Sequence, residues 1–115
     1  MSRLLVTGLA VVAMLMVAAT AMAQDQALIE KGIQVYAEQK CSMCHAIAGK
    51  GNAQGKLDGV GTKLTVEEIK AWIVTPKEMT EKTGAPRRPN MRAYPNLAEG
   101  DLEALLAYMV SLKDK

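Results

Sequence analysis

The pentapeptide Cys41-Ser42-Met43-Cys44-His45 constrains this chain more than any other feature of its sequence. It holds both cysteines and the only histidine among the 115 residues. A redox disulfide of the thioredoxin type needs a βαβ setting, and no run of alternating apolar and polar residues predicts strands. A structural zinc site needs four ligands, and only three candidates are present. A disulfide between Cys41 and Cys44 would close too short a loop to stabilise much.

The chemistry that remains for a C-x-x-C-H motif is the covalent attachment of a c-type haem. Two thiols held about one helical turn apart can each bond one vinyl group of the same porphyrin, and the following histidine then lies beneath the ring. Histidine is a common proximal ligand of haem iron. We therefore predict one haem c, with its iron, as the cofactor. Cys41 and Cys44 are the predicted thioether residues, and His45 is the predicted proximal ligand.

Residues 1–23 have the layout of a secretory signal peptide, with Arg3 near the start, an apolar run over residues 4–19 and an A-x-A site at residues 21–23. A retained membrane anchor is the alternative, because the apolar run is almost long enough to span a bilayer. We expect cleavage, which leaves residues 24–115 as a single domain in the periplasm or otherwise outside the cytoplasm.

The rest of the chain predicts three helices and two long loops, with essentially no sheet. A domain of this size buries only a modest core, and this chain has no Phe and one Trp. Loops of such length are uncommon in compact domains unless they serve a function. We therefore expect them to wrap around a ligand. The predicted helices are Gln26–Gln39, Thr65–Val74 and Glu99–Leu112, and the loops cover residues 46–63 and 75–97.

Local signals support these helices. Thr65 and Glu68 fit a capping box at the start of the second helix, and Pro76 is expected to end it. Gly32 lies inside the first helix, where glycine costs about 1 kcal/mol relative to alanine. Either another helix approaches closely at Gly32, or the glycine is merely tolerated.

The sixth iron ligand decides the chemistry, because a thioether in that position raises the reduction potential and favours electron transfer. Met91 lies in an irregular stretch that Pro89 and Pro95 stiffen, and a pre-ordered loop loses less entropy when it binds. We expect Met91 to be the distal ligand, with Met79 in the same loop as the alternative. If neither binds, the iron is five-coordinate. The methionines after residue 23 are Met43, which faces the wrong side within the motif, Met79, Met91 and Met109, which fits the core of the last helix.

From about Ala27 to Lys113 the chain resembles a small bacterial class I cytochrome c. The resemblance rests on the haem motif, on Gly32-x-x-x-Tyr36 before it and on Leu105-x-x-Tyr108 in the last helix. It implies an all-α cytochrome c fold, in which three main helices and long loops surround one covalently bound haem. In the family, such residues mark the crossing of the first and last helices, which favours close packing at Gly32.

The resemblance also carries the distal ligand onto Met91. The family has a Met-Pro-x-aromatic segment before its last helix, and here Arg92 replaces the proline while Tyr94 keeps the aromatic position. Trp72 resembles a family tryptophan that donates to a haem propionate, and an ordinary core tryptophan is the alternative.

A second departure from the family lies after the motif, where Gly55-Lys56-Leu57 stands in place of a Gly-Pro-x-Leu segment. In the family, a backbone carbonyl there accepts the other ring proton of the proximal histidine. A carbonyl near Gly55 or Lys56 is expected to accept it here, since such contacts orient the ligand and tune the metal.

These observations predict a monohaem electron carrier that is not itself an enzyme. Two alternatives remain: a dedicated subunit of a periplasmic dehydrogenase or oxidase, and a five-coordinate haem protein that binds a small gas. The formal net charge of +2 gives no reason to expect nucleic acid. We expect redox partner proteins, and no membrane contact unless residues 1–23 are retained. The basic cluster Arg87, Arg88 and Arg92 is either a solvated surface or a docking site for an acidic partner.

Overall fold

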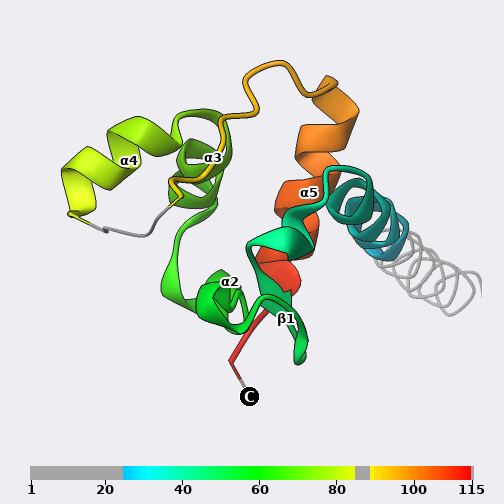
Figure 1. The fold of residues 1–115 in the computed structure, drawn as a ribbon. Coiled ribbons are helices and arrows are strands. Elements are labelled where there is room, and N and C mark those ends of the chain that lie inside the picture. The colour runs from blue at the N-terminus through cyan, green and yellow to red at the C-terminus, as the bar shows by residue number, and fades with distance from the viewer. Residues whose placement is uncertain (1–24, 85–88, 115) are drawn as a thin grey trace, which may run out of the picture.

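The computed structural model describes residues 25–84 and 89–114, so the signal-peptide prediction and two arginines of the basic cluster, Arg87 and Arg88, lie outside the described residues. Within the described residues the fold is mostly helical (Figure 1). No helix there is both long and apolar enough to cross a membrane. The elements are a helix over residues 25–38, the 3-10 turns η1 (Cys41–Met43) and η2 (Ala53–Gly55), the short strands β1 (Ala46–Ile47) and β2 (Lys50–Gly51), and the helices α2 (Val60–Lys63), α3 (Val66–Val74), α4 (Pro76–Thr83) and α5 (Glu99–Ser111).

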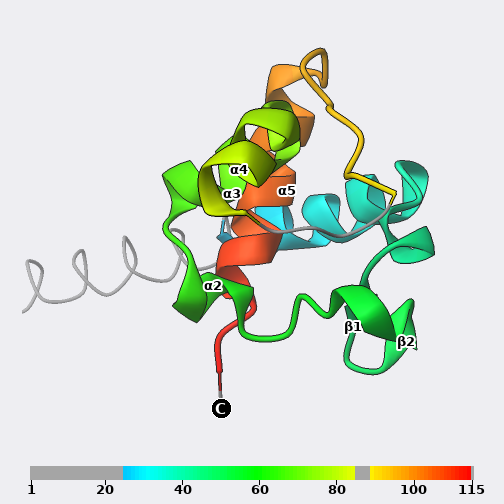
Figure 2. The same cartoon turned by 60° about the vertical axis from the view of Figure 1, so that its left-hand side comes forward.

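The N-terminal helix, residues 25–38, crosses α5 (Figures 1 and 2). The close contact between the two helices lies at Gly32. A Cβ atom on Gly32 would overlap the carbonyl oxygen of Ala104 and lie 2.7 Å from the Cβ of Tyr108. Beside this contact the rings of Tyr36 and Tyr108 meet edge to face, with centroids 5.8 Å apart and planes at 87°. The prediction of close helix packing at Gly32 is therefore confirmed.

Helix α3 begins with the predicted capping box. The Glu68 N–H donates to Thr65 Oγ1 at 3.2 Å, and the Thr65 N–H donates to Glu68 Oε1 at 3.1 Å. The helix buries Ile69 and Ile73 in the core that it shares with α5 and the N-terminal helix. The core cluster that results consists of Val35, Ile69, Ile73, Leu105 and Met109.

The prediction of one continuous loop over residues 75–97 is wrong, because α4 occupies Pro76–Thr83. Pro76 does end α3, as expected, but it also stands at the first position of the next helix. Proline is favoured there because its fixed φ suits a helix start and its missing N–H would have no helical partner. Gly84 ends α4 in the left-handed conformation, with φ of 69°.

The expectation of essentially no sheet needs a smaller correction. Strands β1 and β2 pair antiparallel, with Ala46 opposite Gly51 and Ile47 opposite Lys50. Strands of two residues are too short to show an alternating pattern, so the sequence could not reveal them. The turn between them is fixed by a side chain from outside the hairpin: the Ala48 N–H donates to Asp58 Oδ1 at 2.8 Å.

Candidate haem-binding site

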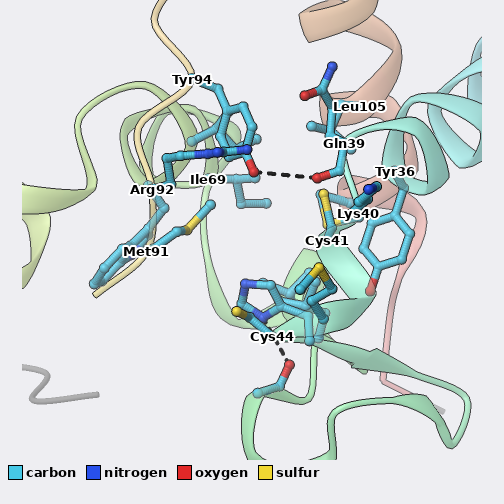
Figure 3. A pocket seen from close by; sticks show the side chains of 18 of the residues that line it. Tyr36, Gln39, Lys40, Cys41, Cys44, Ile69, Met91, Arg92, Tyr94 and Leu105 are labelled. Atoms are coloured by element: carbon cyan, nitrogen blue, oxygen red, sulfur yellow. Dashed lines mark hydrogen bonds between the residues drawn. The ribbon is translucent and has the colours of Figure 1, made fainter. Parts of the chain in front are cut away.

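A cavity of about 770 Å³ lies between the N-terminal helix, η1, α3 and the segment that precedes α5 (Figure 3). This volume is in the range of pockets that enclose small molecules and cofactors. Most of the wall is apolar, which gives a bound group a dry surrounding. The apolar side chains of the wall include Leu57, Val60, Leu64, Ile69, Trp72, Ile73, Leu97, Leu105 and Met109.

The attachment motif forms one wall of this cavity. Lys40 adopts the left-handed conformation, with φ of 56°, and the chain then turns tightly through η1. The N–H groups of Cys44 and His45 both donate to the Cys41 carbonyl oxygen, at 3.1 and 2.9 Å. This turn brings both cysteines and the histidine to the cavity. The two thiols form no disulfide, and burial raises the pKa of the Cys41 thiol.

A backbone carbonyl fixes the orientation of the His45 imidazole. Its Nδ1 lies 2.9 Å from the Gly55 carbonyl oxygen. Because a carbonyl only accepts, Nδ1 carries a proton, and in the neutral form of the ring the lone pair is then on Nε2. This confirms the expectation that a carbonyl near Gly55 or Lys56 accepts a hydrogen bond from the His45 ring. The His45 carbonyl oxygen in turn accepts from Asn52 N at 3.0 Å, so the backbone of the residue is fixed as well.

Met91 enters the cavity from the segment before α5, across from Cys41 and Cys44 (Figure 3). Its side chain is half-buried. Met79 is buried on α4 and forms no part of the cavity wall. The other two methionines do border the cavity: Met43 is 70 % exposed within the attachment turn, and Met109 belongs to the core of α5.

Tyr94 fixes the Met91 segment to the rest of the fold. Its N–H donates to the Ile73 carbonyl oxygen at 2.9 Å, and its hydroxyl lies 3.4 Å from the Gln39 carbonyl oxygen. The Arg92 guanidinium lies over the Tyr94 ring, 5.4 Å from the ring centroid. The sequence pointed to Tyr94 only as the aromatic position of a motif. Its partners lie in α3 and in the turn after the N-terminal helix, and no sequence pattern indicated them.

Two aromatic side chains test how well a haem suits this cavity. Tyr36 lines it and carries the one buried side-chain polar atom without a partner among the described residues, its hydroxyl oxygen. Burial, the main cause, raises the pKa of Tyr36 to about 12, so the hydroxyl stays a neutral donor. Trp72 also lines the cavity. This position is compatible with a tryptophan that donates to a haem propionate and with an ordinary core tryptophan. An apolar cavity with two thiols, an oriented imidazole and an unpaired hydroxyl fits a covalently attached haem. It does not fit a zinc site, since no three His, Cys, Asp or Glu side chains gather around one point within the described residues.

Comparison with known proteins agrees with this chemistry. The family model described as Cytochrome c matches residues 29–113. Cytochrome c oxidase subunit 2 of Alkalihalophilus pseudofirmus is 34 % identical over 97 residues, which cover 76 % of this chain and 27 % of that protein. The chain thus spans about a quarter of the length of this relative. No solved structure matched.

The chain therefore belongs to the cytochrome c family. Its cofactor is covalently bound haem c with iron, and its family role is that of a c-type electron carrier. The fold agrees with the all-α cytochrome c fold expected from the sequence.

Proposed function

We propose that this protein is an exported one-electron carrier whose haem iron is held between His45 and Met91. When bound, the haem supplies an iron that takes up and releases single electrons. The observation that carries the proposal is the shared cavity. Cys41, Cys44 and His45 form one wall, and Met91 reaches in from the opposite side.

The residues of the chain have separate parts in this proposal. Cys41 and Cys44 hold the porphyrin by covalent bonds, so the cofactor is not lost by dilution outside the cell. The Gly55 carbonyl accepts a hydrogen bond from His45 Nδ1, which orients the ring and makes it a better ligand. A methionine opposite a histidine raises the reduction potential and closes the coordination position at which a substrate or gas would bind. The protein then transforms no substrate of its own.

The absorption spectrum of the purified oxidised holoprotein tests this ligand pair. We expect a methionine–iron charge-transfer band in the wild type, its loss in Met91→Leu and its retention in Met79→Leu, the matched control. A high-spin spectrum without that band in the wild type would sink the proposal. Loss of the band in Met79→Leu alone would show that Met79 on α4, and not Met91, is the distal ligand.

Carbon monoxide separates this function from gas binding. A six-coordinate iron should bind carbon monoxide slowly when the native protein is reduced, because Met91 must first leave. The Met91→Leu variant should bind it rapidly. Equally rapid binding in both proteins would favour a five-coordinate gas-binding protein.

A second candidate function is supported by the match to an oxidase subunit. In this interpretation the chain is a dedicated electron-transfer component of a terminal oxidase, with the same haem chemistry and a fixed partner. The native complex can be solubilised in mild detergent and separated by size. Elution of the haem protein with a large oxidase would support this function, and elution at its own mass would support a free carrier.

A further inference from the structure

Arg92 places a positive charge at the haem cavity, in the position where the family motif has a proline. Its side chain is exposed on one side and borders the cavity on the other, next to Met91 in sequence. In Figure 3 it runs alongside the Tyr94 ring, above Met91. A proline in this position would bring no charge at all.

The guanidinium is held without a carboxylate. It lies over the Tyr94 ring at 5.4 Å, a cation–π arrangement. Tyr94 is itself fixed by its N–H bond to the Ile73 carbonyl. Among the described residues the one ion pair is Lys31 with Asp101, at 3.6 Å, so no described carboxylate lies within ion-pair distance of Arg92. Within residues 25–84 and 89–114, therefore, no side chain forms an ion pair with Arg92.

We infer that the charge of Arg92 raises the reduction potential of the haem. A fixed positive charge at the cavity would disfavour the oxidised state of a bound haem, which carries one more positive charge than the reduced state. The apolar cavity wall strengthens this effect, because charge interactions weaken less in a low dielectric than in water. Tyr94 has the supporting role, since its ring keeps the guanidinium at the cavity. This inference rests on the proposed haem site.

The test is the midpoint potential of the purified holoprotein and its variants, measured by spectroelectrochemical titration. Arg92→Gln and Arg92→Pro should both lower the potential, and Arg92→Lys, which keeps the charge, should stay close to the wild type. Lys50→Gln is the matched control, because it removes one exposed charge from β2, away from the cavity wall. Its shift should be several times smaller than that of Arg92→Gln.

Ionic strength gives a second measurement. Arg92 is partly exposed, so the difference between the wild type and Arg92→Gln should shrink as salt is raised from low to high concentration. A structural change in the Met91 segment would give a difference that salt leaves unchanged. The inference is overturned if Arg92→Lys falls as far as Arg92→Gln, or if Lys50→Gln shifts the potential equally.

The methionine–iron band separates this inference from the proposed function. If the band persists in every Arg92 variant, the ligands are intact and any shift in potential belongs to the charge. Absence of the band in the wild type breaks the proposed ligand pair instead, whatever the Arg92 variants do.

Discussion

The two sides of the haem cavity are held by different kinds of contact. On the attachment side, residues 41–57 bond to one another: the Cys41 carbonyl accepts two N–H groups, Asn52 N donates to the His45 carbonyl, and Leu57 N donates to the Ala46 carbonyl at 2.8 Å. On the Met91 side, residues 89–97 make two hydrogen bonds among those the structure describes, and both come from Tyr94.

This difference assigns separate tasks to the two sides. Short-range hydrogen bonds fix the attachment turn and the His45 ring. The Met91 segment depends on distant partners, Ile73 on α3 and Gln39 after the N-terminal helix. Segments with few backbone hydrogen bonds open at lower free-energy cost than well-bonded ones. We therefore expect the attachment side to set stability, and the Met91 side to set ligand exchange and potential.

The largest effect is expected from Gly51→Ala on the attachment side. Gly51 has φ of 112°, and a Cβ there would overlap the His45 carbonyl oxygen and lie 3.1 Å from the Ser42 carbonyl oxygen. Strain and overlap together should lower the free energy of unfolding by about 3 kcal/mol or more. Denaturant titration of the holoprotein measures this.

Gly49→Ala is the matched control for that change. Gly49 also has a positive φ, of 78°, but a Cβ added there would meet no atom within 4 Å. This variant should lose only about 1 kcal/mol, from backbone strain alone. Equal losses in the two variants would show that the contact with His45 does not matter.

A pH effect of intermediate size is expected from Tyr36, which lies beside the attachment turn. Its pKa is raised from 10.0 to about 12 in the folded protein, chiefly by burial. The unfolded chain thus loses the proton first, so the contribution of Tyr36 to stability is fully present below about pH 10 and is lost as pH rises toward 12. Tyr36→Phe should flatten this decline in unfolding titrations. Part of the decline should remain in this variant, because burial also raises the pKa of Tyr108. An unchanged decline in Tyr36→Phe would rule this assignment out.

The smallest effect on stability is expected from Tyr94→Phe on the Met91 side. The bond from its hydroxyl to the Gln39 carbonyl is long, at 3.4 Å, so its loss should cost less than about 1 kcal/mol. The same variant should nevertheless speed the displacement of Met91 by added imidazole, because the segment loses one of its two bonds. Stopped-flow mixing measures that rate. A large loss of stability without a change in displacement rate would contradict the view that the Met91 side controls ligand exchange and the attachment side controls stability.

The sequence predicted those parts of the fold that depend on local chemistry. Thr65 and Glu68 are three residues apart and form a capping box wherever a helix starts. The close approach at Gly32 followed from a glycine inside a helix and from a family pattern. A carbonyl acceptor for the His45 ring followed from the family resemblance, through the segment Gly55-Lys56-Leu57.

The parts that the sequence missed depend on contacts between distant segments or on ambiguous signals. Pro76 marks both the end of one helix and the start of another, so its pattern predicts a loop as readily as the helix α4. The hairpin of β1 and β2 relies on Asp58, ten residues away from Ala48. The partners of Tyr94 are Ile73 in α3 and Gln39 in the turn after the N-terminal helix, and no local pattern indicates contacts between segments so far apart.

Proton NMR of the reduced, diamagnetic holoprotein tests the central claim most directly. A methionine bound to haem iron lies in the shielding region of the porphyrin ring current, so its methyl resonance moves strongly upfield. The account predicts one such methyl, assigned to Met91, together with upfield-shifted ring protons of His45. An upfield methyl assigned to Met79, or no upfield methionine methyl at all, would contradict it.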